Sequence, residues 1–271
     1  MITNIRNNRI KEVTALLTKH KARQQSGLFV VEGIRMMSET PISLLKEVFV
    51  SESFSGRPEM SLMMQRFYAA ADVPVNVVSD QAFSRLSDTL HPQGILAVAH
   101  QPSYDMEAIL DGKYNKENFN GRFLVLESVQ DPGNVGTMLR TAEAAGMDAV
   151  LLGRGCADIF NPKTIRSTMG SLFRQPFAYF DDMRALLDAL GKRNIRTYAA
   201  ALDGSVEYTE ADLGKGGAVF IGNEGAGLLP ETAAGCDERI RIPMEGMTES
   251  LNAAVSAAIL MYEMKRQADG R

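Results

Sequence analysis

The chain has 271 residues, of which 45% are hydrophobic and 23% are charged, and its formal net charge is -4. This length predicts two domains in an ordinary soluble protein, and the acidic balance argues against nucleic-acid binding over the whole surface. No apolar run is long enough to span a bilayer and the N-terminus lacks the hydrophobic centre of a signal peptide, so we expect a cytoplasmic protein. The cysteines and histidines are too scattered to predict a metal site; they are Cys156, Cys236, His20, His91 and His100.

The first segment, residues 6–23, is locally basic, and Glu12 is its one acid. Val13, Leu16 and Leu17 place an apolar stripe beside the charges, so the segment predicts an amphipathic helix. A solvated charged face is the commoner reason for such a pattern, and contact with RNA is the alternative.

After this segment the chain alternates between short apolar runs and periodic stretches. The predicted strands cover residues 28–31, 47–50, 73–78 and 94–98, and the predicted helices cover residues 32–40, 59–70 and 80–87. Such alternation indicates a small sheet covered by helices, so we expect a first domain at residues 1–105. Residues 106–120 contain Asp, Gly and Asn and are predicted to be a linker, in which residues 106–110 allow a helical turn.

A second alternating unit is predicted at residues 121–271. Its strands are expected at residues 123–126, 149–152, 177–180, 196–202, 217–221 and 240–242, and its helices at residues 135–145, 161–170, 182–190 and 251–264. Gly146 suits the C-cap of the first of these helices. The last helix is rich in alanine, so we expect it to be buried on more than one side and to admit a neighbouring backbone or a second subunit.

Two turns of this unit carry chemically informative residues. The strand at residues 217–221 runs into a glycine turn whose spacing, Gly-x-x-Gly-x-Gly, is neither a dinucleotide fingerprint nor a Walker loop. It therefore predicts a cofactor-sized site at the carboxyl edge of a parallel sheet, with neither ATP nor NAD favoured. The turn before the last helix contains Thr248, Ser250 and Asn252, and helix capping is the commoner use of Thr248 or Ser250 there.

Three separated blocks of the second unit resemble the signature motifs of the SpoU/TrmH family of RNA ribose 2′-O-methyltransferases, within the SPOUT superfamily. The blocks are residues 131–136 with Arg140, residues 222–225, and residues 242–244 with residues 250–252. Residues 29–35 and 91–95 also look like the RNA-binding N-terminal domain of many members, a small α/β unit similar to certain ribosomal proteins. The resemblance covers nearly the whole chain.

The resemblance implies an α/β fold in which a smaller N-terminal RNA-binding domain precedes a C-terminal methyltransferase domain with a trefoil knot. The last helix would lie inside this knot. It also implies a homodimer formed through the knotted domains, and S-adenosylmethionine as the cofactor, bound against the knot loops. The positions that match the family's cofactor site are Leu202, Gly222, Asn223, Ile242, Met244 and Leu251. Their glycine and apolar character suits a purine and a thioether.

The resemblance further implies which residues act on RNA. The catalytic group would be Asn134, Arg140, Glu224, Ser250 and Asn252. Because a guanidinium rarely loses its proton, we expect Arg140 to clamp a phosphate and stabilise a developing alkoxide, with Glu224 holding it in place. The expected RNA contacts are Arg6, Arg9, Lys19, Lys21, Arg23, Arg35, Arg166 and Arg174, of which the last two would reach RNA from the second subunit.

The predicted function is therefore S-adenosylmethionine-dependent methylation of a ribose 2′-hydroxyl, in ribosomal RNA because of the extra N-terminal domain. Three alternatives remain open. The substrate could be tRNA, the chain could be a non-catalytic RNA-binding protein, or it could be a different nucleotide-dependent α/β enzyme.

Overall fold

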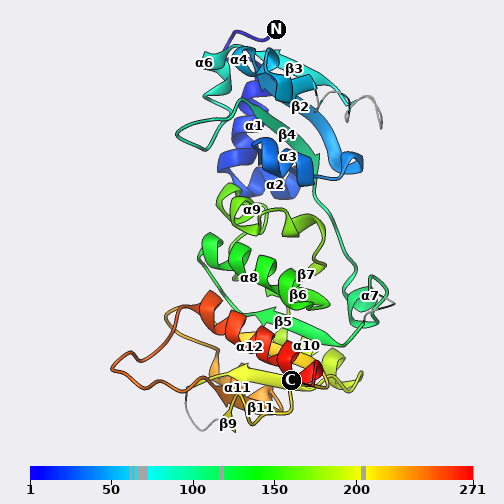
Figure 1. The fold of residues 1–271 in the computed structure, drawn as a ribbon, viewed down its shortest axis with the longest axis vertical. Helices are drawn as coiled ribbons and strands as arrows, with labels where there is room; N and C mark the ends of the chain where they lie inside the picture. Colours follow the sequence, from blue (N-terminus) through cyan, green and yellow to red (C-terminus); the bar gives the residue numbers. More distant parts are fainter. Residues whose placement is uncertain are drawn as a thin grey trace. The chain divides into compact units, whose positions relative to one another are not determined.

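The computed structural model describes residues 1–61, 63, 65, 73–115, 117, 119–202 and 206–270. The chain forms two compact units: Met1–Pro102 joins Asp158–Phe173 in the first, and Ser103–Ala157 joins Arg174–Arg271 in the second (Figure 1). The segment Asp158–Phe173 is thus grouped with the first unit, although the sequence places it in the second predicted domain. The boundaries at residues 105 and 121 stay predictions. The helix expected at residues 59–70 falls largely outside the described residues.

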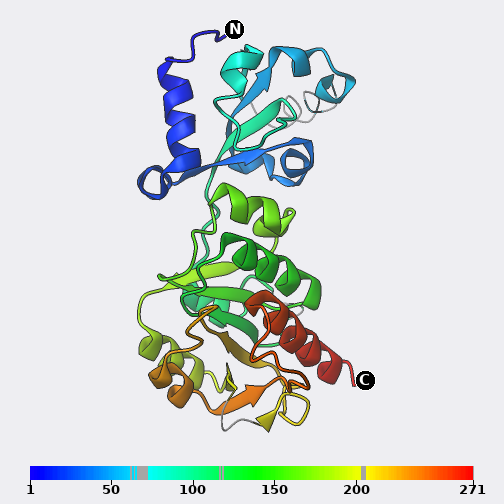
Figure 2. The ribbon, with the colours of Figure 1, turned by 90° about the vertical axis from the view of Figure 1, so that its left-hand side faces the viewer.

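A four-stranded mixed sheet forms the centre of the first unit. Its order is β1 (Leu28–Glu32), β4 (Ile95–His100), β2 (Leu45–Ser51) and β3 (Val75–Val78), and only the β2–β3 pair is parallel. The other elements are α1 (Asn8–Thr18), α2 (His20–Ser26), α3 (Ile34–Glu39), η1 (Ile42–Leu44), α4 (Glu52–Ser55), α6 (Asp80–Phe83), α9 (Pro162–Thr168) and η2 (Ser171–Phe173). Helices α1 and α3 cover opposite faces of the sheet (Figure 2).

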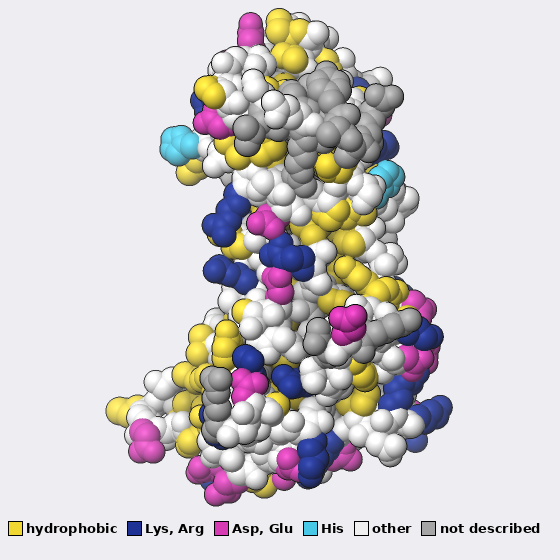
Figure 3. Space-filling model, turned by 45° about the vertical axis from the view of Figure 1, so that its right-hand side comes forward, with side chains coloured by type: hydrophobic (Ala, Val, Ile, Leu, Met, Phe, Trp, Pro, Cys, Tyr) yellow, Lys and Arg dark blue, Asp and Glu magenta, His cyan; other side chains and the backbone are white. Residues whose placement is uncertain are grey.

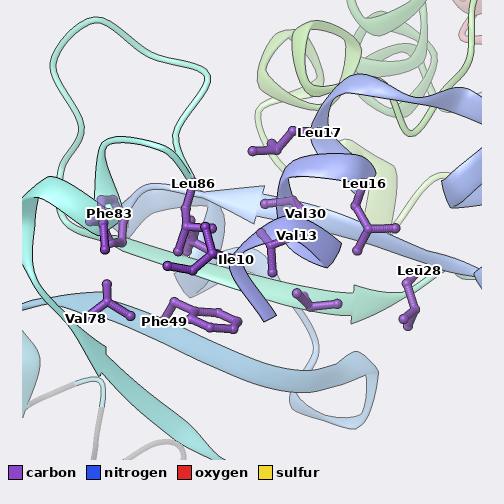
Figure 4. Packing of buried hydrophobic residues seen from close by; sticks show 13 residues of the cluster. Ile10, Val13, Leu16, Leu17, Leu28, Val30, Phe49, Val78, Phe83 and Leu86 are labelled. Atoms are coloured by element: carbon purple, nitrogen blue, oxygen red, sulfur yellow. The ribbon is translucent and has the colours of Figure 1, made fainter. Parts of the chain in front are cut away.

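The apolar stripe of the N-terminal segment packs on this sheet. Ile10, Val13, Leu16 and Leu17 of α1 are buried in one cluster with side chains of β1, β2 and β4 (Figure 4). The predicted single helix is interrupted at Lys19, whose extended backbone separates α1 from α2. Because both faces of the sheet are covered, its strands are nearly continuous apolar runs, which is why the sequence revealed them.

The second unit is built on a seven-stranded parallel sheet. Its order is β7 (Phe177–Phe180), β6 (Ala149–Gly153), β5 (Arg122–Leu126), β10 (Gly217–Ile221), β8 (Thr197–Ala200), β11 (Glu238–Arg241) and β9 (Val206–Glu207). The helices are α7 (Met106–Leu110), α8 (Pro132–Ala145), α10 (Met183–Gly191), α11 (Pro230–Gly235) and α12 (Ala253–Ala268). Helix α7 occupies the helical turn predicted within the linker.

The strand order determines where the loops gather. Strand β10 lies between β5 and β8, so the chain inserts a late strand into the middle of the sheet. The carboxyl ends of β5, β10, β8 and β11 are therefore neighbours at one sheet edge, and the loops that leave them meet there. In parallel α/β sheets, this edge is the usual place for a ligand.

Helices α8 and α12 lie side by side on one face of this sheet, and α10 and α11 lie on the other (Figures 1 and 2). Helix α12 buries Ala254, Ala257 and Met261 toward its neighbours. The opposite side stays open, because Val255 is 47% exposed and Tyr262 is 49% exposed. Within one chain, α12 is therefore not buried all round.

Candidate active site

A cavity of about 510 Å³ lies at the carboxyl edge of the seven-stranded sheet. The end of β8 with residues 201–202 and the end of β10 with residues 222–228 form two parts of its wall. The rest comes from α11, from the end of β11, and from the turn and first residues of α12. This volume is in the range of small-molecule sites.

The glycine turn after β10 forms a closed wall. A Cβ atom at Gly222 would overlap the backbone of Gly227 and Leu228, so no other residue fits there. The backbones of Asn223 and Gly227 exchange two hydrogen bonds of 2.9 Å. The Asn223 side chain donates to the Ser128 carbonyl at 2.9 Å and accepts from two N–H groups of its own turn. The turn is consequently rigid before any ligand binds.

All six residues expected to hold the cofactor line this cavity: Leu202, Gly222, Asn223, Ile242, Met244 and Leu251. They come from three segments far apart in the sequence. Their apolar and backbone groups suit an aromatic base and a thioether, as the sequence predicted from resemblance.

A hydrogen-bonded chain of three side chains borders the cavity. Glu224 accepts hydrogen bonds from Asn134 Nδ2 at 3.0 Å and from the N–H groups of Gln130 and Asp131 at 3.1 and 3.0 Å. Asn252 Nδ2 donates to Asn134 Oδ1 at 3.1 Å. Asn252 Oδ1 in turn caps α12 by accepting from its first N–H groups. The amide of Asn134 is thus held from both ends.

This arrangement keeps Glu224 ionised. Burial raises the pKa of Glu224, whereas the hydrogen bonds from Asn134, Asp131 and Gln130 lower it. Together the hydrogen bonds outweigh burial, so the pKa is below its usual value. A carboxylate with a depressed pKa is a weak base at neutral pH. Glu224 is therefore a positioning group for Asn134.

Arg140 lies apart from this chain of side chains. It is exposed on α8, and its side chain forms no hydrogen bond or ion pair with any residue that the structure describes. Six residues of helix turn it by roughly 240° from Asn134. The expectation that Glu224 holds Arg140 is wrong, because the carboxylate of Glu224 is bonded to Asn134 and the backbone. Arg140 does not line the cavity of its own chain.

Ser250 is exposed and lines the cavity. The N-cap of α12 is Asn252, so neither Ser250 nor Thr248 caps the helix. Within the described part of the chain, the Ser250 hydroxyl has no hydrogen-bond partner. It is therefore available to a ligand, whereas Asn252 is committed to the helix and to Asn134.

The expected RNA contacts fall into two groups. Arg6, Lys19, Lys21 and Arg35 are exposed, and their side chains pair with no described residue; we call them the exposed cations. Three other arginines are paired with acids, in the pairs Arg9–Glu47, Arg166–Asp88 and Arg174–Glu143. Cationic and anionic side chains are interspersed on the face visible in Figure 3.

Arg23 does not present its charge to solvent, so the expectation that it contacts RNA is wrong. It is 3% exposed. Its guanidinium donates to Asp158 at 2.7 Å and to the Leu16 carbonyl at 2.6 Å. The C-terminal end of α1 and the segment after β6 are stabilised by these bonds, so Arg23 is a structural residue.

Sequence reasoning missed Arg239 of β11, which is partly buried and lines the cavity. The sequence Glu-Arg-Ile-Arg-Ile puts Arg239 and Arg241 on the same face of a strand, and nothing in it separates the two.

Burial raises the pKa of Cys156 to about 11 and that of Cys236 to about 12, so both thiols stay protonated.

Membrane-spanning helices and metal-binding clusters are absent from the residues that the structure describes. No helix there is long and apolar enough to cross a membrane. No group of three or more His, Cys, Asp or Glu residues there has the arrangement of a metal site.

Comparisons with known proteins identify the family of this chain. Residues 121–262 match the SpoU rRNA Methylase family, and residues 7–97 match the MRM3-like substrate binding domain. The chain is 35% identical, over 97% of its length and 98% of the relative, to 23S rRNA (guanosine(2553)-2′-O)-methyltransferase RlmP of Bacillus subtilis (strain 168).

Two solved structures are similar over nearly the whole chain. An RNA 2′-O ribose methyltransferase has a TM-score of 0.78 and 32% identity, with 98% of each chain covered. An AdoMet-bound rRNA methyltransferase from Sinorhizobium meliloti has a TM-score of 0.84 and 28% identity, with 98% of this chain and 97% of that chain covered. The expected α/β-knot fold with a separate N-terminal α/β unit is confirmed. The protein belongs to the SpoU rRNA methylase family.

Proposed function

We propose that this protein transfers the methyl group of S-adenosylmethionine to a ribose 2′-hydroxyl of ribosomal RNA. The observation that carries the proposal is the convergence of three distant segments, residues 200–202, 221–228 and 242–251, around one cavity. Asn134 lies beside it, bonded to Glu224 of the cavity wall and to Asn252. The similarity to rRNA 2′-O-methyltransferases over nearly the whole chain supports it.

The residues present fit the cofactor. The rigid glycine turn and the apolar side chains of Leu202, Ile242 and Leu251 can hold a purine by backbone hydrogen bonds and packing. When bound, S-adenosylmethionine supplies a methyl group on a sulfonium sulfur, which is the reactive part of the chemistry. The protein's task is to hold a ribose oxygen in line with that group and to help its proton leave.

The side chains divide this task. Asn134 presents a fixed amide because Glu224 and Asn252 bond to it from both sides. The free hydroxyl of Ser250 is placed to contact the ribose or the cofactor. Arg140 does not line the cavity of its own chain; in the proposed homodimer its guanidinium clamps the phosphate next to the reacting ribose and stabilises the developing alkoxide. The proton leaves through that phosphate, a water molecule or another residue.

The protein acts as a homodimer in this proposal. Val255, Ile259 and Tyr262 form an apolar stripe at helical spacing on the open side of α12, where Val255 and Tyr262 are each about half exposed. Such a stripe is suited to a second copy of the same helix around a two-fold axis. Replacing Val255 and Tyr262 by Asp should give monomers in sedimentation equilibrium. Val206→Asp, at an exposed apolar site on β9, is the matched control.

The first unit binds the RNA substrate in this proposal. The exposed cations are free to contact phosphates, which position an RNA without reading its sequence. Three other arginines would have to give up an ion pair with an acid before they could bind an RNA phosphate. The pairs are Arg9–Glu47, Arg166–Asp88 and Arg174–Glu143. Because the substrate is ribosomal RNA, the protein works in the cytoplasm.

The test is methyl transfer to defined RNAs. Purified protein with S-adenosylmethionine labelled in the methyl group should label ribosomal RNA from cells that lack the protein, and mapping should find the label on a ribose 2′-oxygen. Labelling of tRNA alone would favour the tRNA alternative. Cofactor binding without any transfer would favour a non-catalytic RNA-binding protein.

A further inference from the structure

One charged side chain of the cavity is left unexplained by the proposed reaction. Three charged residues that the structure describes line the cavity: Glu224, Glu249 and Arg239. Glu224 is engaged by Asn134 and two backbone N–H groups, and Glu249 is exposed at the rim. Among the described residues that line the cavity, Arg239 is the one with a positive charge.

Arg239 differs from the other arginines near it. Arg241 pairs with Glu207 at 3.6 Å, and Arg196 pairs with Glu238 at 3.1 Å. The side chain of Arg239 forms no hydrogen bond or ion pair with any residue in the described ranges, although it is partly buried. Removing a guanidinium from water without a partner is costly, so such a residue is most stable when a ligand supplies the missing anion.

The position of Arg239 selects the kind of anion. It lies within β11, opposite Ala199 of β8, and is partly buried. Glu249 and Ser250, which also line the cavity, are exposed to solvent. Ala200, the last residue of β8, and Ala201 after it also line the cavity, and their small side chains leave space beside the strand. An anionic group of a ligand held in the cavity can therefore reach Arg239, which is part of the lining.

The geometry points to Arg239 as the residue that binds the carboxylate of the methionine portion of S-adenosylmethionine. This inference rests on the proposed function and deepens it. The carboxylate is the only anionic group of that cofactor. A guanidinium binds a carboxylate through two parallel N–H···O bonds, which a lysine cannot reproduce. Arg239 thus orients the amino-acid end of the cofactor and leaves the sulfonium end to the knot loops.

The experiment removes the carboxylate and the guanidinium separately. Isothermal titration calorimetry should compare S-adenosylmethionine with decarboxylated S-adenosylmethionine, which lacks only this group. The wild-type protein should bind the complete cofactor about 10- to 100-fold more tightly, as expected for a charge-assisted hydrogen-bonded pair. Arg239→Met should abolish this preference and leave the affinity for the decarboxylated compound within about threefold, the error expected from small rearrangements.

Two further variants sharpen the result. Arg241→Met removes a neighbouring arginine that is paired with Glu207, and it should keep the wild-type preference. Arg239→Lys should restore only part of the preference, because it keeps the charge and loses the two-pronged geometry.

The outcomes separate the inference from the proposed function. If the wild-type protein binds both compounds equally, or if Arg239→Met weakens both equally, the role of Arg239 is refuted while cofactor binding stands. If Arg239→Met changes neither affinity and raises only the KM for RNA, Arg239 serves a phosphate and the inference is again refuted. If the wild-type protein binds neither compound, the proposed function itself fails.

Discussion

The cavity of the second unit and the surface of the first unit that carries the exposed cations, called the basic surface below, use polar groups in opposite ways. At the cavity, Glu224, Asn134 and Asn252 are bonded to one another and to backbone groups. The exposed cations of the first unit are bonded to no described side chain. One region is organised before the substrate arrives, and the other is left free to adapt.

The difference follows from what each region has to do. Methyl transfer requires a ribose oxygen aligned with a carbon, and small displacements there cost large factors in rate. Attraction of phosphates acts over many ångströms and tolerates several geometries, so fixed partners would only compete with RNA. Substitutions at the cavity should therefore be severe and local, and those on the basic surface mild and dependent on salt.

The largest effect is expected at the glycine turn. Gly222→Ala places a methyl group against the backbone of Gly227 and Leu228, so the wall of the cavity must move. We expect loss of measurable S-adenosylmethionine binding by calorimetry and a loss of roughly 1–3 kcal/mol in the free energy of unfolding.

Gly225→Ala is the matched control for this prediction. A Cβ atom there would find its nearest neighbour at 3.7 Å, in ordinary contact with Asn223. Gly225 also lines the cavity, so the two variants are compared in the free energy of unfolding, which Gly225→Ala should leave unchanged. Equal behaviour of the two variants would contradict the idea that Gly222 is needed for close backbone approach.

The second effect concerns the locked amide. Asn134→Asp replaces the Nδ2 donor by an oxygen opposite the Glu224 carboxylate, so attraction becomes repulsion. We expect kcat to fall about 100-fold, because the group at the reaction site is misplaced, while the Kd for S-adenosylmethionine changes by less than about threefold. Thr137→Ala, on the exposed side of the same helix, should keep normal kcat. A rise in Kd that matches the fall in kcat would show that Asn134 shapes the cofactor site instead.

A smaller effect is expected on the basic surface. Replacing Lys19 and Lys21 by Ala should raise the KM for RNA about 3- to 10-fold at low salt and flatten its dependence on salt, because each phosphate contact contributes to that slope. Arg9→Ala removes an arginine already paired with Glu47, and it should change the salt dependence less. An unchanged slope for the double lysine variant would exclude these two residues from the RNA interface.

The smallest effect is on pH-dependent stability. The pKa of Glu224 is lower in the folded protein than its usual value, so the folded state binds fewer protons there. Its contribution to stability is present above the unfolded pKa of about 4.3 and is lost as pH falls through the folded pKa. In urea unfolding, the difference between wild type and Glu224→Gln should be largest near neutral pH and shrink below about pH 4. A difference that stays constant down to acid pH would argue against this linkage.

Local patterns predicted most of the elements of both units. Gly146 closes α8 in the left-handed conformation, and Gly33, with a φ of 93°, delays the start of α3 to Ile34. Strand β3 begins after Pro74, and the expected helix at residues 80–87 ends at Phe83. Short elements such as α4, β9 and α11 were missed, because a few residues carry too little periodicity to be recognised.

The residues that line the cavity were predicted better than the hydrogen-bond partners of the expected catalytic side chains. Gly222, Ile242 and Leu251 line one cavity, as their motifs indicated. The pairing of Glu224 with Arg140 was wrong, because motif spacing says nothing about which donors surround a carboxylate. Arg23 was wrong for a similar reason: a basic segment shows charge, and only packing shows which arginine is turned inward.

The sequence by itself determined the family, the succession of strands and helices, and the residue types at each turn, because these depend on neighbours along the chain. The tertiary structure alone decided that β10 lies between β5 and β8 and that Asn134 is hydrogen-bonded to both Glu224 and Asn252. It also decided that the side chain of Arg239 has no hydrogen-bond or ion-pair partner among the described residues. Those facts depend on contacts between residues about a hundred positions apart, and no local pattern records them.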